Sequence, residues 1–204
     1  RWRRKCVEEI KIKEGSIIVD LMTGMVECWK FILKNSGDNS KLIGLDFSTE
    51  MINRAELNKL KFKNSKIEIL KENVFDNSIS DETVDLVISG FGLKTFNNEQ
   101  LRKLSIEIER ILKPNGEFSL IDVSVPENKS LRSMYMFYLK NIIPVLGKLF
   151  LGNPNTYKML GIYTEAYGNS KNVFKIFNER KFQIEYIEYF FGCATGIKGK
   201  KLKN

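Results

Sequence analysis

Residues Ser16–Glu27 read SIIVDLMTGMVE, an apolar run that ends in an acid and passes into a short loop. The run predicts a buried strand, because it is short, β-branched and bounded by a turn signal. Asp20 closes the strand, and Gly24 lies within the loop. A loop that leads from such a strand into a helix is where α/β folds bind nucleotides. The stretch therefore predicts an α/β fold with a nucleotide-type ligand beside its first strand.

Short apolar runs alternate with amphipathic stretches along most of the chain. We expect strands near 16–20, 41–46, 66–70, 84–89 and 117–123. Apolar residues at intervals of three and four between Leu101 and Ile111 predict a helix that ends at Lys113–Gly116. Ser48 is a plausible N-cap for a helix that carries Met51. Alternation of this kind implies parallel strands with right-handed crossovers.

The C-terminal part departs from that alternation. A helix expected over about 171–181 precedes two runs, 183–190 and 193–198, which only a turn at Phe191-Gly192 separates. Strands joined so closely must be antiparallel. An aromatic and aliphatic segment at about 126–170 follows the fifth strand and predicts a helical lid over the sheet edge. We therefore expect residues 1–204 to form one Rossmann-like, doubly wound α/β domain, with a mostly parallel seven-stranded sheet and a C-terminal antiparallel hairpin.

Composition excludes several kinds of chemistry. The chain has 204 residues, of which 43% are hydrophobic and 28% charged, as in a globular domain with a large core. It contains no histidine, which excludes a serine-type triad and an imidazole-bound metal. The three cysteines lie far apart and are odd in number, so no metal site is expected and a reducing compartment is indicated.

The chain is basic, with a formal net charge of +8. Its lysines are scattered, which is typical of a solvated surface, so we expect no nucleic-acid partner. Only residues 198–203 form a local basic cluster, which a frayed end would also explain. We expect a cytoplasmic protein, because no signal peptide or spanning segment is evident. The chain starts without Met and inside a helical pattern, which suggests a missing N-terminal segment.

Polar and small residues follow the ends of the next three predicted strands. Asp46 ends the second strand, where a carboxylate can accept two hydrogen bonds from a ribose diol. A helix N-terminal acid is the alternative. Asn73-Val74 follows the third strand and could bind the edge and face of adenine. Gly90-Phe91-Gly92 follows the fourth, where small residues let the backbone approach a ligand or form a tight turn.

In their order and spacing these segments resemble the ubiquinone/menaquinone biosynthesis C-methyltransferase family, a branch of the class I methyltransferases that use S-adenosylmethionine (SAM). The general matches are Trp2–Lys5, the loop at Asp20, Gly44–Ser48 with Met51, Val84–Leu93 and Arg110–Gly116. The more specific matches are Leu131–Leu149, Tyr157–Leu160 and Gly192–Gly196. The resemblance covers nearly the whole chain. It implies SAM-dependent C-methylation of a hydrophobic phenolic or quinone-like small molecule, with S-adenosylhomocysteine as the product.

The resemblance also implies which residues bind each ligand. For SAM these are Asp20, Met22, Thr23 and Gly24 beside the methionine half, Asp46 at the ribose, Phe47, Met51, Asn73 and Val74 around the adenine, and Gly90. For the substrate they are Tyr135, Tyr138 and Tyr157. Lys94 is the predicted catalytic residue, because it could stabilise a phenolate or help a water remove the proton. The alternative for Lys94 is a surface lysine at a helix start.

Three residues depart from the family pattern. Met22 and Val26 stand where the loop D-x-G-x-G-x-G has glycines, and they add bulk where backbone amides approach the ligand. Val26, β-branched and in the opening turn of a helix, is the less expected of the two. Its side chain is predicted to point away from the cofactor, or else the cofactor binds poorly. Lys94 replaces an arginine of the family and loses the planar bidentate fork.

Other functions stay open at this point. A member of the fold that binds a small molecule or cyclises it without methylation would also explain Met22 and Val26. A nucleic-acid methyltransferase is suggested by the charge, but no N-P-P-Y type motif follows the fourth strand. A nicotinamide enzyme lacks the G-x-G-x-x-G spacing. Basic residues could hold the protein at an anionic membrane surface if the substrate is membrane-borne. The oligomeric state is not predicted.

Overall fold

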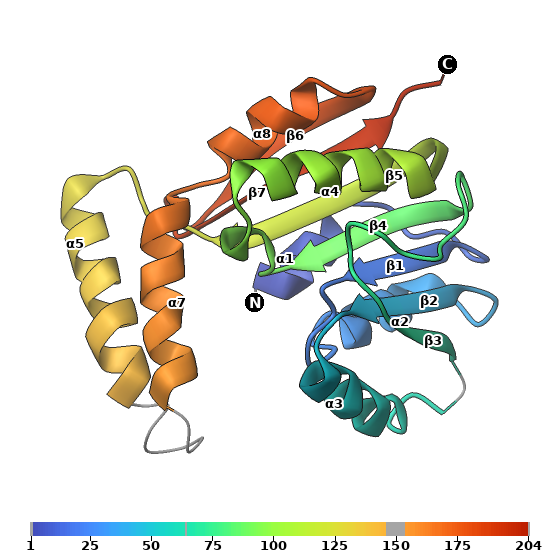
Figure 1. Ribbon diagram of the computed structural model, residues 1–204, viewed down its shortest axis with the longest axis horizontal. Coiled ribbons are helices and arrows are strands. Elements are labelled where there is room, and N and C mark those ends of the chain that lie inside the picture. Colours follow the sequence, from blue (N-terminus) through green and yellow to red (C-terminus); the bar gives the residue numbers. More distant parts are fainter. Residues whose placement is uncertain (1, 64, 146–153, 204) are drawn as a thin grey trace.

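One seven-stranded sheet organises the chain, with the strand order β3-β2-β1-β4-β5-β7-β6 (Figure 1). The computed structural model describes residues 2–63, 65–145 and 154–203. The parallel strands are β1 (Ile17–Leu21), β2 (Lys41–Asp46), β3 (Lys66–Lys71), β4 (Val84–Gly90) and β5 (Leu112–Val123). The antiparallel pair is β6 (Phe182–Tyr189) and β7 (Ala194–Lys201), and β7 pairs with β5. The predicted doubly wound sheet with a C-terminal hairpin is confirmed.

Helices cover both faces of the sheet. On one face lie α1 (Trp2–Glu8), α2 (Trp29–Ser36) and α3 (Thr49–Lys59), and on the other lie α4 (Asn98–Ile111) and α8 (Lys171–Asn178). Two apolar clusters fill the two interfaces. Because β1, β2 and β4 are buried from both sides, their sequences are nearly continuous apolar runs rather than alternating ones. Ser48 caps α3, as expected, by accepting a hydrogen bond from the Met51 backbone N–H at 3.4 Å.

The fifth strand begins earlier than the sequence indicates. It starts at Leu112, which pairs with Val84, and the pairing then shifts register before Glu117. Asn115 adopts a left-handed φ of 65° in the shifted stretch. The turn-forming residues after α4 thus end the helix and also form a bulge in the strand that follows. A pattern of turn residues alone does not distinguish these two roles.

The segment after β5 forms an arm of α5 (Lys129–Phe137), a π-helical turn η2 (Tyr138–Ile142) and α7 (Pro154–Tyr167). Figure 1 shows α5 and α7 side by side, projecting from the edge of the sheet near the end of β5. The helical segment therefore lies where the lid was expected, but it stands beside the sheet instead of covering the ends of β1 and β2. No helix of the described ranges is long and apolar enough to cross a bilayer.

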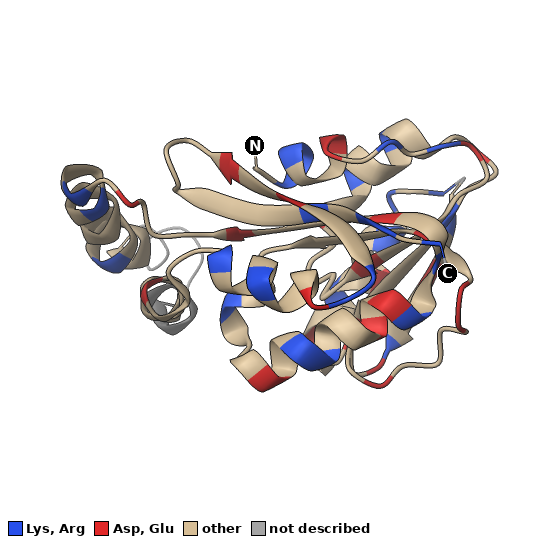
Figure 2. Cartoon of the chain, turned by 90° about the horizontal axis from the view of Figure 1, so that it is seen from above, with Lys and Arg blue, Asp and Glu red and all other residues tan. Residues whose placement is uncertain are grey.

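Charge is dispersed over the molecule. Figure 2 shows Lys and Arg on helices and strands of the sheet domain and on the arm. The C-terminal basic cluster belongs largely to β7 and is not a frayed end: Lys198 pairs with Glu9 and Glu185, and Lys201 pairs with Glu82. These ion pairs neutralise much of the positive charge of the cluster.

Candidate active site

The loop after β1 keeps the backbone of a glycine loop without all of its glycines. Met22, Gly24 and Val26 have φ values of 56°, 53° and 60°. This left-handed region costs a residue with a side chain about 1–2 kcal/mol, and more for a β-branched one. The positions where glycine is usual are therefore the strained ones, and two of them carry side chains. The shape of the loop is retained, and other contacts must hold it.

Asp20 anchors the loop from its buried side. The carboxylate is 2% exposed and accepts hydrogen bonds from the Thr23 hydroxyl at 2.5 Å and the Trp29 indole N–H at 3.1 Å. Gly44 makes room for the indole, since a Cβ on Gly44 would lie 2.5 Å from the Trp29 ring. Burial raises the pKa of Asp20 to about 7, although both hydrogen bonds lower it. Asp20 supports the loop and does not line the cavity described next.

A cavity of about 470 Å³ lies at the carboxyl ends of β1, β2 and β4. Five of the predicted cofactor residues line it together: Met22, Asp46, Phe47, Asn73 and Val74. The wall is completed by residues that include Phe75, Phe91, Gly92, Phe96 and Gln100. The strand-end positions read from the sequence thus converge on one hollow.

Asp46 is the acid of this cavity and is 8% exposed. One carboxylate oxygen accepts the Gly24 backbone N–H at 2.9 Å, and the other accepts the Ser48 N–H at 3.0 Å. Each carboxylate oxygen has a second acceptor site, so both can still receive a hydroxyl group. Asp46 therefore ties the strained loop to the start of α3 and keeps the capacity to bind a diol.

The opposite wall is apolar and aromatic. The Asn73 side-chain oxygen accepts the Phe75 N–H at 3.0 Å, and this local turn brings Val74 and Phe75 into the wall. The rings of Phe75 and Phe96 have their centroids 4.9 Å apart. A carboxylate on one side and aromatic rings on the other suit a ribose joined to a flat base.

Phe75, Phe96 and Gln100 were missed by the sequence analysis. Phe96 precedes the N-cap of α4, Asn97, and Gln100 completes a capping box with that residue. The box is readable from the sequence, because Asn and Gln stand three residues apart before an apolar run. It fixes where α4 begins, and the start of α4 is what carries Phe96 and Gln100 to the cavity.

Val26 points away from the Asp46 cavity, in line with the first alternative predicted for it, whereas Met22, the less suspect of the two, adds bulk there. Met22 lines the cavity, and a Cβ on Gly92 would lie only 2.3 Å from its sulfur. The Met22 side chain thus occupies the space that Gly92 leaves free. Val26 is 6% exposed and packs with Trp29 in the core beneath α2, away from the cavity. Val26 adds backbone strain to the loop, whereas Met22 adds backbone strain and also takes up space in the cavity.

The remaining predicted cofactor residues lie near the cavity but do not line it. Thr23 and Gly24 serve the two acids through the hydrogen bonds described above. Met51 is in the first turn of α3. Gly90, at the end of β4, lies under Arg3 and Cys28: a Cβ there would be 3.0 Å from the Cys28 sulfur and 3.3 Å from the Arg3 Cγ.

Lys94 does not line the Asp46 cavity, and its side chain is largely buried. Its ammonium group donates to the Phe91 carbonyl at 2.6 Å and to Asp122 at 3.1 Å, and the Lys94 backbone N–H donates to Asp122 at 2.8 Å. The Lys94 side chain is 9% exposed and that of Asp122 is fully buried. Burial raises the pKa of Asp122, and Lys94 opposes this effect. The pair fastens the turn after β4 onto β5.

The predicted substrate tyrosines lie on the arm. The Tyr135 hydroxyl donates to the Cys193 carbonyl at 3.3 Å, and its ring packs on the cluster at the root of the arm. Tyr138 is 40% exposed. The Tyr157 side chain lies outside the described residues. Neither Tyr135 nor Tyr138 lines the Asp46 cavity. Over the described part of the chain, no group of three or more Cys, Asp or Glu side chains is placed to hold a metal ion.

Three features together define the class I SAM-dependent methyltransferases. They are a doubly wound sheet with this strand order, a left-handed loop after β1, and an acid after β2 that faces the same cavity as the loop. The chain belongs to the ubiE/COQ5 methyltransferase family, which it matches over residues 1–201. The predicted family, enzyme class and cofactor are confirmed.

The names of similar proteins are consistent with this family. The chain is 28% identical to demethylmenaquinone methyltransferase of Alkalihalophilus pseudofirmus over 204 residues, which cover 98% of this chain and 85% of that protein. It is 29% identical over 202 residues to the protein of the same name from Bacillus subtilis, with coverages of 98% and 86%. A SAM-dependent methyltransferase from Aquifex aeolicus shares the fold, with a TM-score of 0.71, 21% identity and coverages of 98% and 89%.

The different positions of Met22 and Val26 lead to a first prediction. Met22→Gly should tighten binding of S-adenosylhomocysteine about tenfold, because it frees space in the cavity beside Gly92. Val26→Gly, the matched control, should change the dissociation constant less than about twofold, because its side chain lies in the core. Isothermal titration calorimetry measures both. A larger change in affinity for Val26→Gly than for Met22→Gly would show that the loop is not held as described.

The Lys94–Asp122 pair leads to a second prediction. Lys94→Met leaves the buried Asp122 without its partner and should lower the free energy of unfolding by about 3–5 kcal/mol. Lys113→Met is the control, because Lys113 pairs with Asp85 at 2.8 Å in a partly exposed position and should cost at most about 1 kcal/mol. Urea unfolding measures both values. Equal losses, or lost activity with unchanged stability for Lys94→Met, would contradict a supporting role for Lys94.

Proposed function

We propose that this enzyme transfers the methyl group of SAM to a ring carbon of a hydrophobic quinol or related phenol. The observation that carries the proposal is the cavity in which the Asp46 carboxylate faces aromatic rings beside the strained loop. The names of the relatives support a quinone-like acceptor, since both are called demethylmenaquinone methyltransferase. Family membership favours methyl transfer over a binding or cyclising role for the fold.

The chemistry requires little of the protein beyond position. SAM, when bound, supplies a methyl group on a positively charged sulfur. Transfer breaks the sulfur–methyl bond, whose electron pair stays on sulfur, and forms a carbon–carbon bond at the ring. The ring carbon then releases one proton to water, so charge and atoms balance without a metal or a redox partner. The protein contributes alignment of the two reactants and exclusion of water.

Individual side chains have distinct parts in this proposal. Asp46 accepts the ribose hydroxyls, and Asn73, Phe75 and Phe96 bound the base. Asp20 holds the loop in its ligand-binding shape through Thr23 and Trp29. Lys94 has a positioning role, because its ammonium group donates both to the carbonyl of Phe91 and to the buried Asp122. Phe91 is a residue of the cavity wall.

The proposal extends to where the enzyme works. The three cysteines are buried and unpaired, which supports the reducing cytoplasm. On the arm, apolar side chains are exposed close to the cations of α5 and η2, Lys129, Arg132 and Lys140; they include Met134, Phe137, Ile142 and Val145. This combination supports peripheral contact with an anionic membrane, where apolar side chains enter the interface and cations face the lipid headgroups. Co-sedimentation with anionic vesicles, lost when Phe137 and Ile142 become Ser, tests the contact.

The role of Asp46 provides the central test. Asp46→Asn should weaken binding of S-adenosylhomocysteine about tenfold to a hundredfold, because charge-assisted bonds to the ribose hydroxyls are lost. Asp38→Asn, an exposed acid before β2, should leave the affinity unchanged. Calorimetry gives the affinities, and transfer of labelled methyl from SAM to a dithionite-reduced prenyl-1,4-naphthoquinone gives the activity. Saturable cofactor binding without labelling of any quinol or phenol would refute the proposed acceptor.

A further inference from the structure

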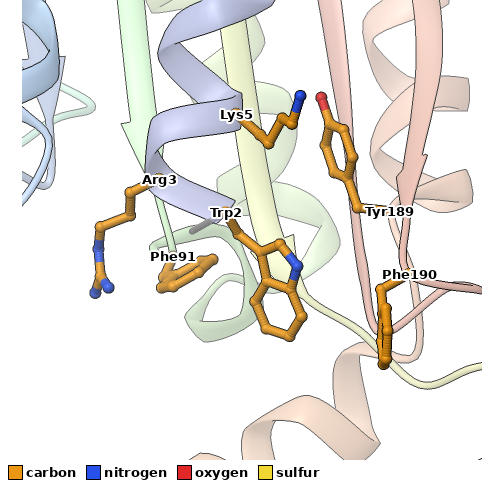
Figure 3. Close-up of a pocket in the computed structure, with 6 residues that line it drawn as sticks. All are labelled: Trp2, Arg3, Lys5, Phe91, Tyr189 and Phe190. Carbon is orange, nitrogen blue, oxygen red and sulfur yellow. The ribbon is translucent and has the colours of Figure 1, made fainter.

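A second cavity lies on the other side of Phe91. It has a volume of about 520 Å³ and opens between α1, the end of β4 and the turn that joins β6 to β7. Figure 3 shows the rings of Trp2, Phe91, Tyr189 and Phe190 around it, with the Lys5 ammonium group and the Tyr189 hydroxyl at the same end. The wall is thus mostly apolar, with the Lys5 ammonium group at one edge, 3.6 Å from a Glu8 carboxylate oxygen. The Tyr189 hydroxyl at the same edge donates a hydrogen bond to Glu9.

Phe91 belongs to the walls of both cavities. Its ring meets the Trp2 ring edge-to-face, with centroids 6.3 Å apart and planes at 80°. The Arg3 guanidinium lies 4.3 Å from the centroid of the Phe91 ring and pairs with Glu27 at 2.5 Å. Phe91 is therefore held in place by an aromatic contact, a cation–π contact and the Lys94 hydrogen bond to its carbonyl.

Backbone strain marks the same residues. Phe91 has a φ of 79° and Phe190 a φ of 49°, both in the left-handed region that bulky side chains avoid. Residues held in such conformations cluster at ligand sites, where the surrounding structure maintains them. Met22 lines the Asp46 cavity, Phe190 lines the second cavity, and Phe91 lines both. All three residues have a strained, left-handed backbone.

We propose that the second cavity is the acceptor site and that it binds the flat ring of a quinol or phenol. This inference rests on the proposed function. The ring packs among Trp2, Phe91 and Phe190, and a ring oxygen lies toward the Lys5 ammonium group. The two cavities meet at Phe91, and there the ring carbon contacts the methyl group directly, so that it passes from sulfur to carbon in one step. An anionic oxygen is stabilised by the Lys5 charge at the moment when the ring carbon must act as a nucleophile.

This placement moves the acceptor away from the arm tyrosines. Tyr135 is committed to the Cys193 carbonyl, and Tyr138 points outward on the arm. The arm contributes differently, because the cluster of Val123, Met136 and Leu139 at its root packs on both Trp2 and Phe91. An apolar substituent that leaves the cavity would therefore meet apolar surface at the arm.

Adjacent phenylalanines in the β6–β7 turn provide a matched pair of variants. Phe190 and Phe191 are both exposed, at 64% and 75%, and both have left-handed φ values, but only Phe190 lines the cavity. With dithionite-reduced prenyl-1,4-naphthoquinone as the probe, Phe190→Ala should raise the acceptor KM about tenfold. Phe191→Ala should change it less than about twofold. Neither variant should alter the dissociation constant of S-adenosylhomocysteine.

Tryptophan fluorescence gives a binding measurement that needs no turnover. The chain has two tryptophans, Trp2 in the cavity wall and the fully buried Trp29. The oxidised probe, bound in the cavity, should quench the emission of Trp2. The saturable quenching should disappear in Trp2→Phe, whose remaining emission comes from Trp29, and should require higher probe concentrations in Phe190→Ala.

The outcomes separate this inference from the proposed function. If the wild-type enzyme methylates no quinol or phenol, the proposed function fails. If it methylates the probe while Phe190→Ala and Phe191→Ala have the same KM, or quenching persists unchanged in Trp2→Phe, the acceptor binds elsewhere and the inference is overturned. A raised KM for Phe190→Ala alone, together with loss of quenching in Trp2→Phe, supports the second cavity.

Discussion

The site depends on a loop that two acids hold in a left-handed conformation. Asp20 holds it from the buried side through Thr23 and Trp29, and Asp46 holds it from the cavity side through the Gly24 N–H. Strain of about 1–2 kcal/mol at each of two non-glycine residues is comparable to the net value of one or two hydrogen bonds to a charged group. Burial of Val26 also offsets part of the cost. The loop therefore keeps its shape although two of its usual glycines are absent.

The positions of the strand ends predicted the residues of the cavity better than the sequence of the loop after β1 did. Asp46, Asn73 and Val74 were placed at the cavity by topology alone, because the carboxyl ends of parallel strands lie along one edge. Phe75 and Phe96 were not, because their positions depend on a side-chain turn at Asn73 and on the exact start of α4. The strands and their alternation with helices followed from periodicity, whereas the positions of these side chains depend on local hydrogen bonds.

Long-range partners were the least accessible to sequence reasoning. The charge of Lys94 and its place after β4 suggested catalysis, but its partner Asp122 lies 28 residues away on β5, and only the register of β4 with β5 brings the two together. The arm shows the same limit. Its aromatic content was evident, yet the direction in which it leaves the sheet depends on packing at its root, where Met136 and Leu139 meet Val123.

The two cavities are built from different parts of the chain, and this has a consequence for how the enzyme can change. The Asp46 cavity uses residues between Met22 and Gln100, which fold around β1 to β4. The proposed acceptor cavity joins the N-terminal helix to the β6–β7 turn beside Phe91, so it forms only when the N-terminal helix and the C-terminal hairpin are both in place. Because Trp2, Lys5 and Phe190 line the second cavity and not the Asp46 cavity, substitutions at these residues can alter the acceptor without disturbing Asp46 or the loop. Selectivity for the acceptor can therefore vary while the geometry that binds SAM is kept.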